Sequence, residues 1–132
     1  KEKWSNGPRS YLGLASAGFP NLFTVTGPGS PSVLANMVVA IEQHVNLIGQ
    51  CLKQMDAKGY KTFDVTTEAE DNWVEQVRVA ADRTLFTACD NWYQGTNIPG
   101  KPSGFVPYVD WPGYVAICEA AVDNGYSGFV FC

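Results

Sequence analysis

A turn rich in glycine and proline, directly before a long helical stretch, is the first feature that could bind a ligand. Residues 27–32 read Gly-Pro-Gly-Ser-Pro-Ser. A helix N-terminus presents unpaired N–H groups and a partial positive charge, which favour an anion or a carbonyl-rich ring edge. Gly27 and Gly29 would let a ligand approach the backbone closely. The alternative is a structural turn in which these residues serve only the geometry, and the turn taken alone favours that alternative.

The second candidate is a long loop, residues 91–102, in which aromatic and amide side chains adjoin. Trp92 and Tyr93 lie between Asn91 and Gln94, and glycine and proline interrupt regular structure after them. Aromatic rings and amides in a long loop suit stacking on a nucleotide and hydrogen bonding to it. In the competing interpretation Trp92 and Tyr93 only anchor the loop to the core. The spacing of the residues does not distinguish these two interpretations.

The remaining titratable residues have structural explanations. His44 is the single histidine, and no Ser, Cys or acid is placed to form a triad with it, which favours a hydrogen-bonded structural role. Glu68, Glu70 and Asp71 fall in the first turn of a predicted helix, where acids complement the macrodipole, so we expect them to be solvated. We therefore expect no catalytic residue in this chain, and no metal site, because the cysteines form no CxxC pair.

The elements that position the first candidate are a strand and a helix. Residues 21–26 are β-branched or aromatic and predict a short strand. The apolar spacing predicts a helix over residues 33–58, with Ser32 as its N-cap and Gly59 after its C-terminus. The first two turns of this helix are apolar nearly all round, so we expect them to be buried on most sides.

The second half of the chain predicts two shorter helices and little sheet. Thr67 and Glu70 fit a capping box at the start of one helix, and Asp110 fits the cap of another. Residues 105–109 are expected to be extended at a sheet edge, and residues 128–131 to form a last strand. The result is an α/β chain with a long helix, a second helix and a small strand-helix-strand tail, with too few strands to cover the long helix.

Composition narrows the class of protein. The chain has 132 residues and a formal charge of −4, with scattered bases, so neither nucleic acid nor an anionic membrane is an expected partner. No apolar run approaches the roughly 20 residues of a membrane span. The four cysteines are spread out, which is typical of free thiols in a reducing, cytoplasmic setting. Because no initiator Met is present, we expect the sequence to be a piece of a longer chain.

Several motifs occur together in one order and resemble a known family, the flavin-dependent Baeyer–Villiger monooxygenases of the cyclohexanone and phenylacetone type. The resemblance is to the C-terminal part of these enzymes and extends over essentially the whole chain. It rests on Gly18-Phe19-Pro20-Asn21-Leu22-Phe23, Gly27-Pro28-Gly29-Ser30-Pro31-Ser32, Ile41-Glu42-Gln43-His44, Glu70-Asp71-x-Trp73-Val74-Glu75 and Trp92-Tyr93-x-Gly95-x-Asn97-x-Pro99-Gly100-Lys101-Pro102.

The resemblance implies an NADPH- and FAD-dependent enzyme. In that family the reduced flavin traps dioxygen as a peroxide, which converts a ketone to an ester or lactone. The implied fold is the C-terminal portion of a flavoprotein with two dinucleotide-binding domains. Residues 1–60 would supply the last strand and long helix of the FAD-binding domain, and residues 61–132 the C-terminal helix, the cofactor loop and the tail. The remainder of the same polypeptide would be the partner.

The resemblance also implies roles for particular residues. The 27–32 turn and the start of the long helix would close over the flavin, with Gly29, Asn36 and Met37 as cofactor contacts. Trp92 would contact NADP. The substrate side of the turn would be formed by Ser32, Val33 and Leu34.

Much of the family pattern has no counterpart in this sequence. The GxGxxG motifs for FAD and NADP and the motif FxGxxxHxxxWP do not occur, and the arginine that stabilises the flavin peroxide in that family lies upstream of this segment. Asp110-Trp111 departs from the small residues expected there. We therefore expect the chain alone to be inactive. A heteroatom-oxidising flavin monooxygenase and a non-catalytic binding module with the same half-fold stay open as alternatives.

Overall fold

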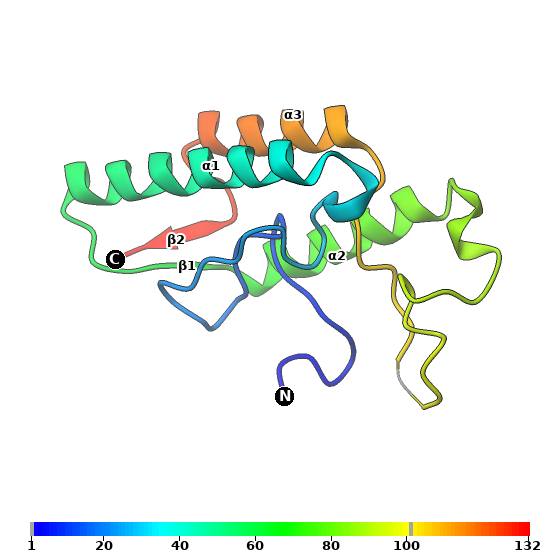
Figure 1. Ribbon diagram of the computed structural model, residues 1–132. Helices are drawn as coiled ribbons and strands as arrows, with labels where there is room; N and C mark the ends of the chain where they lie inside the picture. Colours follow the sequence, from blue (N-terminus) through cyan, green and yellow to red (C-terminus); the bar gives the residue numbers. More distant parts are fainter. Residues whose placement is uncertain (1, 101) are drawn as a thin grey trace.

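The computed structural model describes residues 2–100 and 102–132, without the side chain of Val33 (Figure 1). The long helix and the C-terminal helix lie side by side, above a two-stranded sheet, and the second helix passes beneath them. Within the described residues the elements are, in order, η1 (Ser32–Leu34), α1 (Met37–Lys58), β1 (Phe63–Val65), α2 (Thr67–Ala81), η2 (Leu85–Thr87), α3 (Trp111–Asp123) and β2 (Phe129–Phe131).

The long helix α1 ends where its sequence predicts but begins later. Gly59 ends it with a left-handed φ of 73°. Ser32 does not cap it: Ser32 opens the short 3₁₀ turn η1, and Ala35 then breaks the path with an extended backbone. The cap is Asn36, whose side chain accepts hydrogen bonds from the amides of Val38 and Val39. The helix is therefore 22 residues long.

The two shorter helices agree with their predicted positions. The N-cap of α2 is Thr66, one residue before the predicted Thr67, and its hydroxyl accepts from the Ala69 amide at 3.1 Å. Asp110 caps α3 and accepts from the Gly113 amide, so the Asp110-Trp111 pair makes an ordinary helix start. Periodicity located both helices because each buries one face.

The sheet differs from the prediction. Residues 128–131 do contain β2, but its partner is β1, which the sequence did not reveal. The two strands pair antiparallel with Phe63 opposite Phe131. Residues 105–109 are extended without forming a strand. Each strand has only three residues, too few to show a period of two.

The predicted strand over residues 21–26 is wrong, because this segment is an irregular loop. Asn21 and Thr26 at its two ends have positive φ values of 60° and 53°, which an extended strand does not allow. The amide of Thr24 bonds to the Leu14 carbonyl at 2.7 Å, in another loop. The Asn21 amide donates to the Phe63 carbonyl of β1 at 3.0 Å, but among the described residues the segment forms no ladder with this strand, so β propensity alone does not make it extended.

Two apolar clusters form the core, and an irregular N-terminal segment passes through both. Leu12 and Leu14 lie in the first cluster, and Ala15 and Ala17 in the second. The other buried members are Trp73, Val77, Tyr108, Tyr114, Cys118 and Ala121 in the first, and Cys51, Met55, Phe63, Val65 and Tyr126 in the second. Residues 12–17 therefore join α2 and α3 to the sheet.

One face of α1 is uncovered. Val38, Val45 and Leu52 follow one another at intervals of seven residues and are 64%, 54% and 51% exposed. In the first two turns of α1 itself, Ala40 is buried while Val38 and Val39 are exposed, so the burial expected on most sides is not supplied by the described part of this chain. None of the helices in residues 2–100 and 102–132 is both long and apolar enough to cross a membrane.

Candidate functional site

The 27–32 turn and the 91–102 loop form opposite walls of one cleft. Its volume is about 330 Å³. Ser32 belongs to one wall, Trp92 and Tyr93 to the other, and Val106 and Pro107 close it between them. The remaining lining residues are Thr26, Gly27, Pro28 and Ser30. The two candidates from the sequence, about 60 residues apart, are thus one site.

Backbone hydrogen bonds hold the turn against the chain that follows the aromatic loop. The Gly29 amide donates to the Val106 carbonyl at 2.8 Å, and the Tyr108 amide donates to the Ser30 carbonyl at 2.9 Å. The Val106 amide in turn donates to the Tyr93 carbonyl at 3.0 Å. Residues 105–108 therefore fix the spacing between the two walls.

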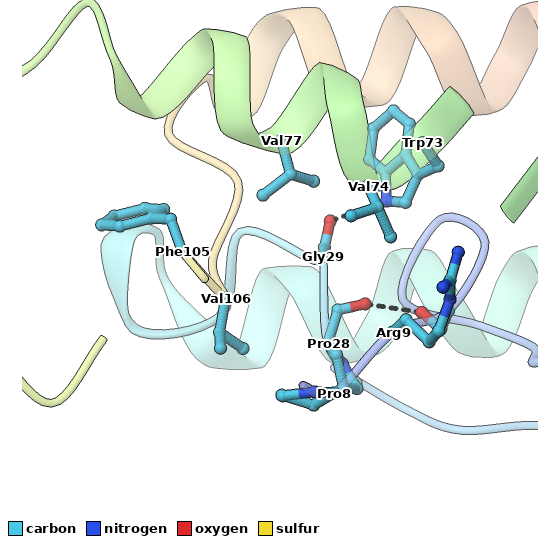
Figure 2. Close-up of a pocket in the computed structure, with 10 residues that line it drawn as sticks. Pro8, Arg9, Pro28, Gly29, Trp73, Val74, Val77, Phe105 and Val106 are labelled. Atoms are coloured by element: carbon cyan, nitrogen blue, oxygen red, sulfur yellow. Dashed lines mark hydrogen bonds between the residues drawn. The ribbon is translucent and has the colours of Figure 1, made fainter. Parts of the chain in front are cut away.

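The back of the turn rests on α2, as Figure 2 shows. The Trp73 indole donates to the Gly29 carbonyl at 3.1 Å, and the Ser10 hydroxyl donates to the Pro28 carbonyl at 2.5 Å. Gly29 has a φ of 86°, and a Cβ there would lie 2.6 Å from the Trp73 indole nitrogen. Only glycine fits this position, so the motif glycine is explained by packing as well as by backbone conformation.

The two aromatic residues of the loop have different roles. Trp92 is 64% exposed and stacks on Tyr93 with ring centroids 4.1 Å apart. Tyr93 packs in turn against Phe86 and Phe105. Pinning of the loop therefore falls to Tyr93, while Trp92 presents its ring outward, between the cleft and a second cavity of about 530 Å³ on its other side.

The other predicted site residues lie around the turn. Ser32 lines the cleft, and its hydroxyl lies 3.9 Å from the Met37 sulfur. Asn36 is exposed and occupied by capping α1. Leu34 is half-buried in η1. The side chain of Val33 lies outside the described part of the chain.

The cleft suits an uncharged planar group better than a phosphate. The amides of Gly27, Gly29 and Ser30 all donate to carbonyls within the chain, so none of them is free to bind an anion. The lining side chains carry no charge. A ring system could stack on the exposed face of Trp92, whereas dinucleotide phosphates would need a glycine-rich strand-to-helix turn with free amides.

Glu70 is not solvated, which corrects the prediction for this residue. Its side chain is 0% exposed, accepts from the Ala17 amide at 3.1 Å, and pairs with Lys3 at 2.7 Å and Arg9 at 3.0 Å. Asp71 is exposed and is joined by the same arginine, and Glu68 faces solvent as expected. Glu70 therefore fastens the N-terminal segment to α2, close to the back of the turn.

His44 has the structural, hydrogen-bonded role that its surroundings in the sequence favour. It is fully buried, its Nδ1 accepts from the Thr26 amide at 3.0 Å, and its Nε2 bonds to the Tyr114 hydroxyl. Burial lowers the pKa of His44 to about 4, so the imidazole is neutral at pH 7. Thr26 lines the cleft and was not among the residues singled out from the sequence.

Curated relatives match the chain from end to end. It is 34% identical to a Baeyer–Villiger monooxygenase from Pseudooceanicola batsensis and 36% identical to a phenazine N-monooxygenase from Lysobacter antibioticus. The matches cover 98% and 96% of the chain. The chain spans only 24% and 23% of the lengths of these relatives. No family model matches the chain.

Solved structures match equally closely. A steroid monooxygenase bound to NADP is 41% identical in sequence and superposes with a TM-score of 0.90. A closed cyclohexanone monooxygenase is 36% identical and superposes with a TM-score of 0.92. Each match covers 99% of this chain and 24% of the other. The resemblance inferred from the motifs is confirmed. The chain corresponds to a C-terminal portion, about a quarter in length, of the flavin-dependent Baeyer–Villiger monooxygenases.

Proposed function

We propose that this chain is part of an NADPH- and FAD-dependent monooxygenase that uses dioxygen to convert ketones to esters or lactones. The observation that carries the proposal is the cleft, where the turn expected to face flavin and substrate meets the loop expected to contact NADP. FAD, reduced by NADPH, supplies the oxygen activation when it is bound. This chain supplies the turn and the loop that line the cleft, and none of the phosphate-binding turns.

We assign residues by their positions in the turn, at the start of α1 and in the loop. Trp92 offers an exposed ring face for stacking on NADP. Met37, Asn36 and Gly29 form the side toward the flavin, with Gly29 acting through its shape because both its backbone groups are bonded internally. Ser32, Val33 and Leu34 form the substrate side.

We assign the remainder of the same polypeptide as the partner of this chain. The apolar stripe of Val38, Val45 and Leu52 is a surface that a folded domain would cover, and the relatives are about four times as long as this chain. We assign residues 1–60 to the FAD-binding domain and residues 61–132 to the C-terminal tail. The four cysteines are all free, which supports a cytoplasmic setting.

The test is made on the full-length protein. Ketone-dependent NADPH consumption with an ester as product is expected. Trp92→Ala should raise KM for NADPH while flavin content stays equal. Ile98→Ala is the matched control, because Ile98 lies in the same loop, is 49% exposed and does not line the cleft. Lost flavin with an unchanged KM would contradict the role of Trp92.

Selectivity tests the turn separately. Leu34→Ala should change relative kcat/KM among ketones by roughly tenfold, in favour of bulkier ones, because apolar pocket contacts are worth about 1–3 kcal/mol of discrimination. Leu85→Ala is a control, because this side chain in η2 is 87% exposed and does not line the cleft. An unchanged ranking of ketones in Leu34→Ala would remove the turn from the substrate site.

Heteroatom oxidation is the second candidate, because a phenazine N-monooxygenase is 36% identical over 96% of the chain. The discriminating measurement offers the full-length protein a ketone and an aromatic N-heterocycle in parallel. Formation of an N-oxide without any ester would favour this candidate over the first.

A further inference from the structure

A buried hydrogen-bonded chain connects the cleft to the C-terminal helix. It runs from the Thr26 amide to His44 Nδ1 at 3.0 Å, from His44 Nε2 to the Tyr114 hydroxyl, and from that hydroxyl to the Leu12 carbonyl at 2.6 Å. His44 and Tyr114 are both 0% exposed. These three hydrogen bonds therefore join the loop before the turn, α1, α3 and the N-terminal segment.

The chemistry of the groups fixes the direction of each of these three hydrogen bonds. A backbone amide can only donate, so His44 Nδ1 must be unprotonated and accept from Thr26. The neutral imidazole then carries its proton on Nε2 and donates it to Tyr114. The Leu12 carbonyl can only accept, so the Tyr114 hydroxyl donates to it. One tautomer of His44 satisfies all three partners.

The residue held at the cleft end is strained. Thr26 has a φ of 53°, a left-handed conformation that a β-branched residue rarely adopts, and it immediately precedes Gly27. Such a conformation persists only where surrounding contacts enforce it. The bond from its amide to His44 is one such contact, and Thr26 is itself a lining residue of the cleft.

We propose that His44 is a positioning residue for the cleft: in its Nε2–H tautomer it holds Thr26, and through Thr26 it sets the position of the 27–32 turn that forms one wall. The low pKa agrees with this role, since protonation of Nδ1 would oppose an N–H to the Thr26 N–H. Where the proposal concerns cofactor kinetics it rests on the proposed function.

Two substitutions separate the halves of the imidazole. In His44→Asn the side-chain oxygen stands where Nδ1 was, so the acceptor for Thr26 is kept and the donor to Tyr114 is lost. In His44→Gln the amide nitrogen reaches the place of Nε2, so the donor is kept and the acceptor is lost. Both variants are polar and no larger than histidine. If His44 only filled space, the smaller Asn would not keep the turn closer to wild type than Gln does.

The experiment is amide hydrogen exchange by mass spectrometry on the full-length protein, on peptides covering residues 24–32. Exchange there should be about tenfold faster in His44→Gln than in wild type, while His44→Asn should stay close to wild type. In Tyr114→Phe the Nδ1 of His44 still accepts from the Thr26 amide, so hydrogen exchange in residues 24–32 should again stay close to that of the wild type. Equal exchange in the Asn and Gln variants would overturn the proposal. If the Gln variant does not fold, unprotected exchange in the Asn variant overturns it equally.

Kinetics on the same proteins give the functional readout. His44→Gln should raise KM for NADPH at least about threefold with a smaller change in kcat. In His44→Asn the KM for NADPH should stay close to that of the wild type. A wild-type protein that oxidises no NADPH would refute the proposed function, while hydrogen exchange would still test the role of His44 independently. Equal KM in all three proteins, with normal NADPH oxidation, would refute the link between His44 and the cleft.

Discussion

At the scale of single residues, two buried polar side chains join distant parts of this chain. Glu70 binds the N-terminal segment through Lys3, Arg9 and the Ala17 amide. His44 binds the loop before the turn and α3 through Thr26 and Tyr114. Each satisfies its partners inside a region where unpaired polar groups are costly, so removing either leaves those partners unsatisfied.

Replacing Glu70 tests the first of these connections. Glu70→Gln should lower the free energy of unfolding by roughly 3 kcal/mol, because the charges of Lys3 and Arg9 lose a buried partner. Urea unfolding of the 132-residue chain measures the change. Glu68→Gln is the matched control, since Glu68 is exposed in the same turn of α2 and should change stability by less than about 0.5 kcal/mol. Equal losses in both variants would mean that Glu70 is solvated after all.

The lowered pKa of His44 predicts a pH dependence of stability. The unfolded imidazole titrates near 6.5 and the folded one at about 4, so between these values the unfolded chain binds more protons. Stability is therefore highest above pH 6.5 and should fall on acidification toward pH 4, by up to about 1.4 kcal/mol per pH unit. The titratable groups facing His44 from α3 do not offset this, since burial raises the pKa of Tyr114, and raises that of Cys118 to about 11.

Urea unfolding between about pH 7.5 and pH 4 gives this slope, and His44→Asn provides the reference. The variant carries no titratable imidazole, so the difference between the two proteins should shrink as the pH falls. A constant difference across the range would contradict a depressed pKa for His44.

At the scale of elements, capping side chains decide where the helices begin. Asn36 starts α1, Thr66 starts α2 and Asp110 starts α3. In α1 the choice of cap separates η1 from the helix and leaves Ser32 free to line the cleft. The wall of the cleft is therefore an irregular turn and a short 3₁₀ segment, with the helix behind them.

The position of the α1 cap can be measured. Asn36→Ala should cost about 1 kcal/mol of stability, because the amides of Val38 and Val39 lose their acceptor. Ser32→Ala should cost a few tenths of a kcal/mol, since its hydroxyl has only a long contact to the Met37 sulfur. Thermal or urea unfolding of the two variants compares them directly. A larger loss from Ser32→Ala would place the helix start at Ser32.

At the scale of the whole molecule, the chain has a core of its own and an uncovered apolar surface. Two clusters of buried residues are joined by residues 12–17, yet the stripe of Val38, Val45 and Leu52 faces outward. An apolar stripe of this length along a helix is typical of a surface that another part of a protein covers.

Charge placed on this stripe should act differently in the chain and in the full-length protein. Val45→Glu should change the stability of the isolated chain by less than about 0.5 kcal/mol, because Val45 is 54% exposed there. In the full-length protein the same substitution should lower the free energy of unfolding several times more, because it would bury an unpaired charge. Gln50→Glu, exposed on the same helix, is the control. Equal effects of Val45→Glu in both contexts would show that nothing covers the stripe.

Local sequence patterns were enough to locate the helices, two of their caps and the two candidate segments, whereas the predicted N-caps Ser32 and Thr67 were wrong. Periodicity and capping depend on residues within a few positions of one another, so α1, α2 and α3 could be predicted, together with Gly59 and Asp110. The ordered motifs also indicated the family, which the comparisons confirmed.

Features that depend on distant contacts became known only from the folded chain. Glu70 resembles an ordinary first-turn acid until residues 3–17 fold over it. The strand β1 exists because Phe63 meets Phe131. Residues 21–26 are a loop because, among the described residues, they meet β1 at Phe63 but form no ladder with it. The cleft forms because Val106 bonds to both Gly29 and Tyr93. Pairing partners far apart in the chain leave no local pattern, so packing alone reveals them.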